Sequence, residues 1–332
     1  METKLTNKKR VLAGMRATGR LHLGNYLGGA LGMVELQNNP EYETFYMVAD
    51  VHCITTPYAV SELRESRKDV IIDYLAVGLD PDKSTIFVQS MVPTHLELQF
   101  YLSSVITVAR MQHLPTYKEK VAQYPTHVTM ALLNYPVLMA ADILAYKAHK
   151  VPVGIDQEPH LEAARQIARN VNEIYGTDFP EPVRFATKGS YVPSLLGEGK
   201  MSKTVEGSYI NLTDSLDTIK AKLAKTPTDE GRGTKVPERG HVANLFTFVE
   251  LFMGEDTRKD YEHAYTTSKV SYKDLKEKLG NAIYEKLKPI QEKRLEVASR
   301  EGYVEDVINE GAKKALEVTQ RTLSQLKEKM GF

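Results

Sequence analysis

The sequence predicts an α/β protein: a parallel-sheet domain with a helical insertion, followed by an α-helical C-terminal domain. Three observations predict it. Strand-like and helix-like patterns alternate through the first two hundred residues, as in a parallel α/β sheet. From about residue 96 to residue 146 the pattern is helical without an intervening strand. After residue 207 no strand pattern persists.

Four short apolar runs predict the strands of the sheet, and an amphipathic stretch at 61–77 predicts a helix between two of them. Ligands of such sheets bind at the carboxyl ends of the strands, so function is expected in the residues after each run. The runs are Val11–Ala13 before Gly14, Thr44–Val48 before Ala49 and Asp50, Ser84–Val88 before Gln89, and Lys150–Val153 before Gly154.

The helical segments divide the chain into two predicted domains, 1–206 and 207–332. We expect the insertion at about 96–146 to be interrupted by a loop near Leu114–Tyr124. In the second domain, Thr213-Asp214 predicts the cap of a helix running towards Lys225. The charged stretch Thr226–Gly240, rich in Gly and Pro, predicts a loop, and His241–Phe332 is almost entirely helical in pattern.

Composition excludes several classes of protein. No stretch approaches the ~18 apolar residues of a membrane span, and the polar N-terminus lacks the apolar core of an export signal. The single cysteine, Cys53, excludes an intrachain disulfide and a multi-cysteine metal site, so we expect a cytoplasmic protein. A net charge of zero argues against non-specific coating of nucleic acid, although RNA binding through a local patch stays possible.

A glycine-containing segment follows the first predicted strand: Thr18-Gly19-Arg20-Leu21-His22-Leu23-Gly24-Asn25-Tyr26. Gly19 and Gly24 allow backbone and nucleotide to approach closely. His22 and Asn25 would share a face at a helix start, where free N–H groups and the helix dipole favour phosphate. Taken alone, the segment is equally compatible with a glycine-rich turn that carries a surface histidine.

A second segment, Lys200-Met201-Ser202-Lys203-Thr204, lies between Gly199 and Gly207. Glycines on both sides predict a loop that can move. Its two lysines supply point charges suited to pyrophosphate oxygens, and loop closure would complete the site when ATP is bound. Taken alone, two nearby lysines are the ordinary content of a solvated basic turn.

Together and in this order, the two segments resemble the ATP-binding motifs of class I aminoacyl-tRNA synthetases, His-x-Gly-His and Lys-Met-Ser-Lys-Ser, with Asn25 and Thr204 as the departures. The resemblance implies a Rossmann-type catalytic domain that activates a carboxylate with ATP and Mg²⁺, without a protein-ligated metal. It assigns catalysis to His22, Asn25, Lys200 and Lys203. It assigns ATP contacts to Arg16, Thr18, Gly24, Asn25, Gly154, Asp156, Lys200, Met201, Ser202 and Lys203.

A third segment, Ala131–Leu144, places one carboxylate in a markedly apolar helical run. Tyr135, Met139 and Asp142 stand at i, i+4 and i+7 and so share one helix face. A carboxylate buried there needs a partner. That partner could be a structural arginine or a backbone N–H. It could also be an indole ring, whose N–H is a donor only and complements an acceptor-only carboxylate.

The segment Leu138–Leu144 resembles the indole-binding segment of bacterial tryptophanyl-tRNA synthetases, and Ala49–Thr55 and Val151–Gln157 also match segments of that family. The resemblance runs from about Val11 to Phe332, more loosely in the last third. It implies that Asp142 receives the indole N–H, that Met139 packs on the ring, and that Gln157 meets the polar end of the amino acid. The tryptophan-binding residues that it implies are Asp142, Met139, Tyr135, His52, Gln157, Gly14, Val151 and Val153.

Two positions depart from the family. Leu12 stands where an aromatic residue is frequent, which predicts a softer pocket wall, and Arg16 stands where glutamine is frequent, which adds a cation near the phosphates. Lys118 and Lys120 resemble a family loop that approaches the phosphates, and they are also compatible with solvated helix charges.

Three alternatives stay open. A tyrosyl-tRNA synthetase shares the fold and both motifs, but it typically has a glutamine where this chain has Met139, whose thioether suits an indole face. A non-catalytic, synthetase-like regulator would be expected to lose motif residues such as Lys200 and Lys203. A small nucleotidyltransferase would have a shorter chain and no reason for the segment around Asp142.

The resemblance also implies partners: L-tryptophan, ATP, tRNA(Trp) and a second subunit in a homodimer, without a membrane. It implies that the helical domain reads the anticodon. Single-stranded bases are read by stacking and edge contacts. Candidates for such contacts are Arg294, Arg300, Arg321, Tyr272, Tyr284 and Tyr303.

Overall fold

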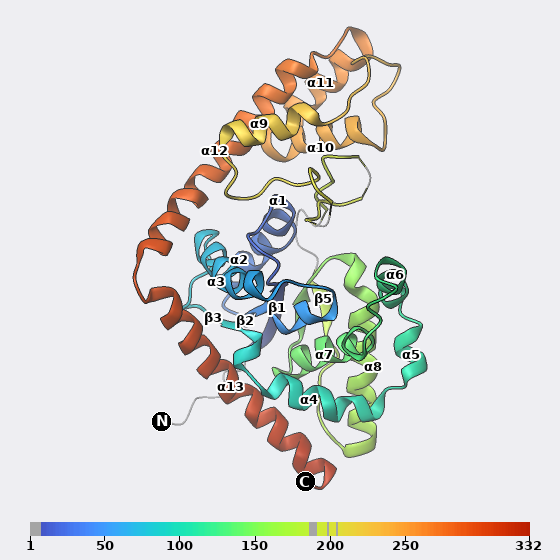
Figure 1. The fold of residues 1–332 in the computed structure, drawn as a ribbon, viewed down its shortest axis with the longest axis vertical. Helices are drawn as coiled ribbons and strands as arrows, with labels where there is room; N and C mark the ends of the chain where they lie inside the picture. The colour runs from blue at the N-terminus through green and yellow to red at the C-terminus, as the bar shows by residue number, and fades with distance from the viewer. Residues whose placement is uncertain (1–7, 186–190, 198, 204) are drawn as a thin grey trace. The chain divides into compact units, whose positions relative to one another are not determined.

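The computed structural model describes residues 8–185, 191–197, 199–203 and 205–332 (Figure 1). The chain forms two compact units that alternate along the sequence. The first unit contains the described residues of Met1–Gly19, Leu31–Thr187 and Val297–Phe332. The second contains those of Arg20–Ala30 and Lys188–Glu296. The division between the two units therefore does not coincide with the predicted domain boundary after residue 206.

The first unit is built on a parallel sheet with the strand order β3-β2-β1-β4-β5. The strand order reverses at β1, whose two neighbours are β2 and β4, and such a switch point is where open α/β sheets bind ligands. The strands are β1 (Lys9–Arg16), β2 (Tyr42–Ala49), β3 (Ser84–Val88), β4 (Lys150–Pro152) and β5 (Val183–Phe185).

Four of these strands confirm the sequence prediction, and β5 was not predicted. Its three residues follow two prolines, Pro180 and Pro182, and none of them is fully buried, so it carries little of the apolar pattern of a strand. The short β5 completes the sheet beside β4, pairing Val151 with Arg184.

Helices cover the sheet of the first unit, and their apolar faces join the strands in one core. The helix predicted at 61–77 is α3, and the predicted helical insertion lies between β3 and β4. The helices are α2 (Leu31–Gln37), α3 (Val60–Ala76), α4 (Thr94–Leu102), α5 (Val108–Gln112), α6 (Pro115–Gln123), α7 (Met130–Ala145), α8 (Glu158–Tyr175) and α13 (Tyr303–Met330), with short turns η2 (Val51–Thr55), η3 (Gln89–Met91), η4 (Ser103–Val105) and η5 (Ile155–Gln157).

The loop predicted at Leu114–Tyr124 is wrong, because that stretch forms helix α6. Pro115 stands at the start of α6, where the missing N–H costs nothing and the fixed φ suits the helix. A proline after an apolar residue therefore marked the beginning of a helix here, and the connecting loop follows α6.

The C-terminal helix α13 packs against the edge strand β3 (Figure 1). The contact is close at Gly311, where an added Cβ would lie 1.7 Å from the carbonyl oxygen of Ile86. The hydroxyls of Thr94 and Thr319 add a buried hydrogen bond of 2.5 Å between α4 and α13. Helix α13 therefore belongs to the unit that contains the sheet, although it lies at the C-terminal end of the chain.

The second unit contains Arg20–Ala30, and with it all of the first glycine-containing segment after Gly19, together with a group of helices. The loop predicted at Thr226–Gly240 and the helices predicted after His241 are confirmed. The elements are α1 (Leu23–Asn25), the π-helical turn η1 (Tyr26–Ala30), α9 (Leu216–Lys225), α10 (His241–Met253), α11 (Glu255–Thr267) and, up to Glu296, α12 (Tyr272–Ser299).

The cap predicted for α9 at Thr213-Asp214 is wrong by one residue. Ser215 caps the helix, with its hydroxyl accepting from the N–H of Thr218. Asp214 instead accepts from the N–H of Asn211 and from Lys222. No helix in the described part of the chain is long and apolar enough to cross a membrane.

Candidate active site

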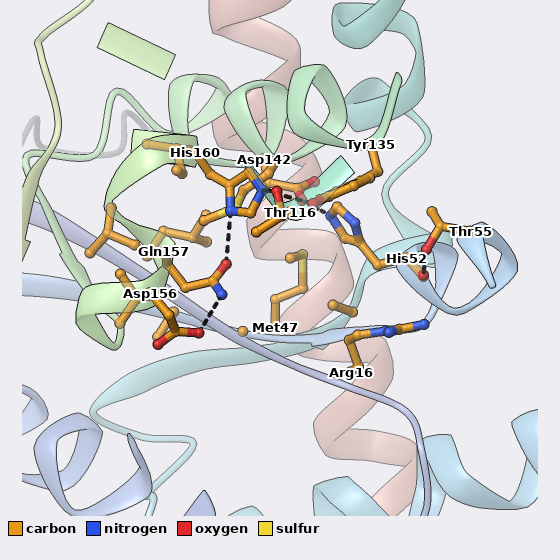
Figure 2. A pocket seen from close by; sticks show the side chains of 18 of the residues that line it. Arg16, Met47, His52, Thr55, Thr116, Tyr135, Asp142, Asp156, Gln157 and His160 are labelled. Atoms are coloured by element: carbon orange, nitrogen blue, oxygen red, sulfur yellow. Dashed lines mark hydrogen bonds and ion pairs between the residues drawn. The ribbon is translucent and has the colours of Figure 1, made fainter. Parts of the chain in front are cut away.

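A cavity of about 440 Å³ lies at the switch point of the sheet (Figure 2). It is bounded by β1, β2 and β4 and by helices α6, α7 and α8. All of its lining residues belong to the first unit. Its size lies in the range of small-molecule sites.

Apolar side chains form most of the cavity wall. Leu12 and Gly14 alternate along β1, Met47 and Ala49 along β2, and register pairs Gly14 with Met47. The period of two explains why these residues share one face of the sheet. Further apolar lining residues are Leu132, Tyr135, Met139, Ile143, Val151 and Val153.

Asp142 is the charged group set into this wall, and it is 2% exposed. Its Oδ2 accepts from His52 Nε2 at 2.8 Å. Its Oδ1 accepts from Gln89 Nε2 at 2.8 Å and from His95 Nδ1 at 2.6 Å. The partner of this carboxylate is therefore neither an arginine nor a backbone N–H, the two structural partners that the sequence suggested.

These donors decide the charge of Asp142. Burial raises its pKa, but the hydrogen bonds from His52 and His95 outweigh burial and hold the pKa below its ordinary value. The group is thus an ionised acceptor at neutral pH. A carboxylate offers about four acceptor positions, and three are occupied. One position remains, on Oδ2, beside a largely apolar cavity.

The other end of the cavity is polar. Gln157 Nε2 donates to Asp156 at 2.8 Å, and Gln157 Oε1 lies 3.0 Å from His160 Nδ1. His160 Nε2 lies 2.8 Å from the hydroxyl of Tyr135 and 2.7 Å from that of Thr116. In Figure 2, Gln157 and Asp156 lie on the side of the cavity away from His52 and Arg16.

His160 holds this network together as a neutral ring. It is 2% exposed, and burial followed by repulsion from His52 lowers its pKa to about 4. With the proton on Nδ1, it donates to Gln157 and accepts at Nε2 from a hydroxyl. This arrangement fixes the amide of Gln157 with its NH₂ group directed to Asp156.

Arg16 is the cation of the cavity that comes from β1. Its Nη2 donates to the hydroxyl of Thr56 at 3.0 Å. Glu119 and Lys120 reach the cavity from α6, whereas Lys118 is exposed and does not line it. Of the two lysines singled out in the sequence, the structure thus brings only Lys120 to the cavity.

In the second unit, His22 and Asn25 cap the short helix α1. His22 Nδ1 accepts from the N–H of Asn25 at 3.3 Å, and Asn25 Oδ1 accepts from the N–H of His22 at 3.2 Å. This reciprocal pattern is a capping box. It assigns the ring proton of a neutral His22 to Nε2, which is then a donor.

The two motif segments meet within this unit at Gly24 and Met201. An added Cβ at Gly24 would stand 2.8 Å from the His22 ring and 3.3 Å from the Cβ of Met201, so only glycine fits between them. Burial, then the charges of Lys203 and Lys200, lower the pKa of His22 to about 3. His22 is therefore uncharged at neutral pH, with two cations nearby.

Some predicted residues lie elsewhere. Thr18 lines a second cavity of the first unit, of about 360 Å³, and Gly154 precedes η5 without lining the main cavity. Thr204 is outside the described residues. The anticodon candidates divide between the units: Tyr272, Tyr284 and Arg294 lie in the second, and Arg300, Tyr303 and Arg321 in the first.

Sequence reasoning missed several residues of the site. Met47 lies in the predicted strand Thr44–Val48 and Ala49 directly follows it, so their alternation could have indicated them. Gln89 directly follows a predicted strand as well. His95, Thr116 and His160 join the site from separate helices, and no local pattern marks them. No group of three or more His, Cys, Asp or Glu side chains that could hold a metal ion occurs among the described residues.

Comparison with known proteins identifies the family. Residues 3–288 match the family described as tRNA synthetases class I (W and Y). The chain is 39% identical to the tryptophan--tRNA ligase of Porphyromonas gingivalis over 97% of this chain and 99% of that protein. It is 39% identical to that of Thermotoga maritima over 97% and 99%.

A solved structure agrees with these relatives. The tryptophanyl-tRNA synthetase of Campylobacter jejuni, in complex with ADP and tryptophan, is 30% identical to the chain. It has a TM-score of 0.83, and the match covers 97% of this chain and all of that one. The chain therefore belongs to the class I tRNA synthetases, within the branch of the bacterial tryptophan--tRNA ligases.

Proposed function

We propose that the chain is a tryptophan--tRNA ligase that activates L-tryptophan with ATP-Mg²⁺ and transfers it to the 3′-terminal ribose of tRNA(Trp). The observation that carries the proposal is Asp142, an ionised and buried carboxylate in a largely apolar cavity, with one acceptor position left. An indole provides one donor on an otherwise apolar bicyclic ring, which matches both features.

In this proposal the indole enters beside Met139 and Tyr135, and its N–H meets Oδ2 of Asp142. His52 shares that oxygen, and Gly14, Val151 and Val153 complete the wall. Gln157, held by His160, meets the polar end of the amino acid. The relative from Campylobacter jejuni, solved with tryptophan and ADP, supports this assignment of substrates.

The substrate carboxylate then attacks the α-phosphorus of ATP, and the bond to pyrophosphate breaks. No side chain acts as a nucleophile, so catalysis consists of positioning and charge stabilisation. Lys200 and Lys203 stabilise the charge that develops on pyrophosphate, and neutral His22 donates through Nε2. The remaining ATP contacts proposed are Arg16, Thr18, Gly24, Asn25, Gly154, Asp156, Met201 and Ser202, with Mg²⁺ arriving as part of the substrate.

Tyrosine is the competing substrate, because its hydroxyl could also donate to Asp142. The apolar surroundings favour tryptophan. Met139 and Ile143 flank Asp142 on α7, and Leu12 faces the cavity from β1. A phenol has an oxygen that also accepts hydrogen bonds, and its burial without a donor is unfavourable.

The proposal extends to the rest of the chain. The helical region 207–332 binds tRNA(Trp) and reads its anticodon, residues 1–206 carry the catalysis, and two copies of the chain form the working dimer. The product, tryptophanyl-tRNA, is used in translation, so the enzyme acts in the cytoplasm. The helical content of α9–α12 and the full-length match to the curated relatives support the assignment.

The experiment that tests the complete reaction is aminoacylation of tRNA(Trp) transcript with radiolabelled amino acids. Tryptophan should be attached with formation of AMP and pyrophosphate, and the product should be labile to base as an ester. Charging of tRNA(Tyr) with tyrosine would identify the tyrosine ligase instead. Binding of tRNA without charging by any of the twenty amino acids would identify the non-catalytic regulator.

A further inference from the structure

Behind Asp142 lies a chain of buried hydrogen bonds that does not reach the cavity surface. His95, on α4, is 0% exposed. Its Nδ1 lies 2.6 Å from Asp142 Oδ1, and its Nε2 lies 2.8 Å from the hydroxyl of Tyr146, which is also 0% exposed. Neither His95 nor Tyr146 lines the cavity. The hydrogen-bonded link between these residues and the cavity is therefore made by Asp142.

The chemistry of the partners fixes the protons of this chain. The ionised Asp142 only accepts, so His95 Nδ1 carries the proton of their hydrogen bond. Burial, and then the charge of Asp142, raise the pKa of Tyr146, so its hydroxyl keeps its proton. With a proton on Nδ1, His95 offers Nε2 as the acceptor for that hydroxyl at 2.8 Å. In this arrangement of protons, the hydrogen bond between Asp142 and His95 and the one between His95 and Tyr146 each have one donor and one acceptor.

Gln89 completes the support of the same oxygen. Its Oε1 accepts from the N–H of Val51 at 3.1 Å, which directs its Nε2 to Asp142 Oδ1 at 2.8 Å. His95 and Gln89 thus occupy both acceptor positions of Oδ1. Oδ2, which His52 approaches at 2.8 Å, keeps the only open position.

We propose that His95 is a positioning residue for tryptophan recognition. Its Nδ1–H, held in place by Tyr146, turns the carboxylate of Asp142 so that the open position of Oδ2 meets the indole N–H. The inference rests on the proposed function, because it takes the indole as the occupant of the cavity. Hydrogen bonds weaken steeply with misalignment, so a carboxylate that can rotate recognises the N–H less well.

The test compares L-tryptophan with β-(3-benzothienyl)-L-alanine, which has sulfur in place of the indole N–H and the same bicyclic shape. The readout is the kcat/KM for tryptophan divided by the kcat/KM for the benzothienyl analogue, both measured in pyrophosphate exchange. His95→Leu should lower this ratio by about tenfold or more, because the loss falls on tryptophan. His95→Asn keeps an N–H donor near the position of Nδ1, and it should retain most of the ratio.

Two tyrosines supply a matched pair of milder variants. Tyr146 and Tyr46 are both 0% exposed, and the hydroxyl of Tyr46 donates to the carbonyl of Met33 at 2.6 Å, outside the cavity. Tyr146→Phe should lower the ratio about threefold, and Tyr46→Phe should leave it unchanged. These variants and His95→Asn decide the matter if His95→Leu does not fold.

The pH profile gives an independent readout. Without the bond from His95, the pKa of Asp142 should rise, so the acid limb of kcat/KM for tryptophan should begin at a higher pH in His95→Leu than in the wild type. Equal losses on both substrates in His95→Leu, or an unchanged ratio in Tyr146→Phe, would overturn the proposal. Absence of tryptophan-dependent exchange in the wild type would overturn the proposed function instead.

Discussion

Asp142 is ionised although only 2% of its surface is exposed, because donors from three elements replace the lost water. His52 comes from η2, Gln89 from η3 and His95 from α4. Removing one of these donors destabilises the buried charge. The same arrangement leaves one acceptor position for a ligand.

Asp142→Asn tests the use of that position. The amide has one acceptor oxygen and an NH₂ group that must face donors, so recognition of the indole N–H weakens. Losing a hydrogen bond to a charged group costs about 1.5–3 kcal/mol, which is a fall in kcat/KM for tryptophan of roughly 10- to 150-fold. Pyrophosphate exchange measures it, with the KM for ATP as the control. An unchanged kcat/KM for tryptophan would show that the carboxylate does not bind the substrate.

The buried histidines predict the acid sensitivity of the protein. The pKa of His160 is lowered to about 4 in the folded state, against about 6.5 when unfolded, so between these values the unfolded chain binds more protons. The free energy of unfolding should therefore rise with pH from about 4 to 6.5 and level off above. His22, lowered to about 3, acts in the same direction.

His160→Gln isolates this contribution. It should reduce the slope of unfolding free energy against pH between about 4.5 and 6 by up to roughly 1.4 kcal/mol per pH unit, the limit for one proton. Urea unfolding at several pH values measures the slope. A slope identical to that of the wild type would mean that His160 is protonated in the folded state as well.

The residues of the site that sequence reasoning found share one property: each lies in a segment with a local pattern. Tyr135, Met139 and Asp142 follow helical spacing. His95 and His160 could not be found in this way, because they meet Asp142 and Gln157 only through tertiary contacts. Spacing along one element predicts a face, and it contains no information about which side chains of other helices support that face.

At the scale of elements, the strands were predictable because apolar runs of three to five residues end at small or polar residues. The errors occurred at the N-terminal ends of helices. Pro115 opens α6, although it was expected within a loop, and the cap of α9 is Ser215, one residue after the predicted pair. The last strand, β5, has three residues and needs its neighbour β4 to define it.

The contact between α13 and β3 predicts an effect on stability. Gly311→Ala would place a Cβ 1.7 Å from the carbonyl oxygen of Ile86, so helix and strand must move apart. Such overpacking costs about 1–3 kcal/mol, more than the roughly 1 kcal/mol that alanine gains over glycine in a helix. Thermal or urea unfolding should show a net destabilisation.

Gly280→Ala, in α12, is the matched control. There the nearest atom, at 2.9 Å, is the Cγ of Lys220, a flexible side chain that can move aside. This variant should be neutral or slightly more stable than the wild type. If Gly311→Ala is as stable as Gly280→Ala, the close packing of α13 on β3 is wrong.

At the scale of the whole molecule, the compact units cut across the predicted domains. The His22 segment is near the N-terminus and yet belongs to the same unit as Lys200 and Lys203, while α13 belongs to the unit of the sheet. A boundary drawn from composition at residue 206 could not reveal this, because the pattern of a segment does not state what it packs against. The assignment of tRNA binding to 207–332 stays a proposal.

Anticodon reading by the helical region predicts a separation of two activities. Substituting one base of the CCA anticodon should lower kcat/KM for aminoacylation strongly, by about 1–3 kcal/mol per lost stacking or edge contact. Pyrophosphate exchange without tRNA should not change. The protein stays intact in this experiment, so folding is not at issue. Equal charging of the altered tRNA would show that the region does not read the anticodon.

The most direct test of the central claim is the exchange of labelled pyrophosphate into ATP by the wild-type chain with tryptophan, with tyrosine and without an amino acid. We predict exchange with tryptophan, no more than a trace with tyrosine, and none without an amino acid. Lys203→Ala should abolish most of it while leaving the KM for tryptophan nearly unchanged, as expected of a charge that acts in the transition state. Exchange that prefers tyrosine, or that needs no amino acid, would contradict the account.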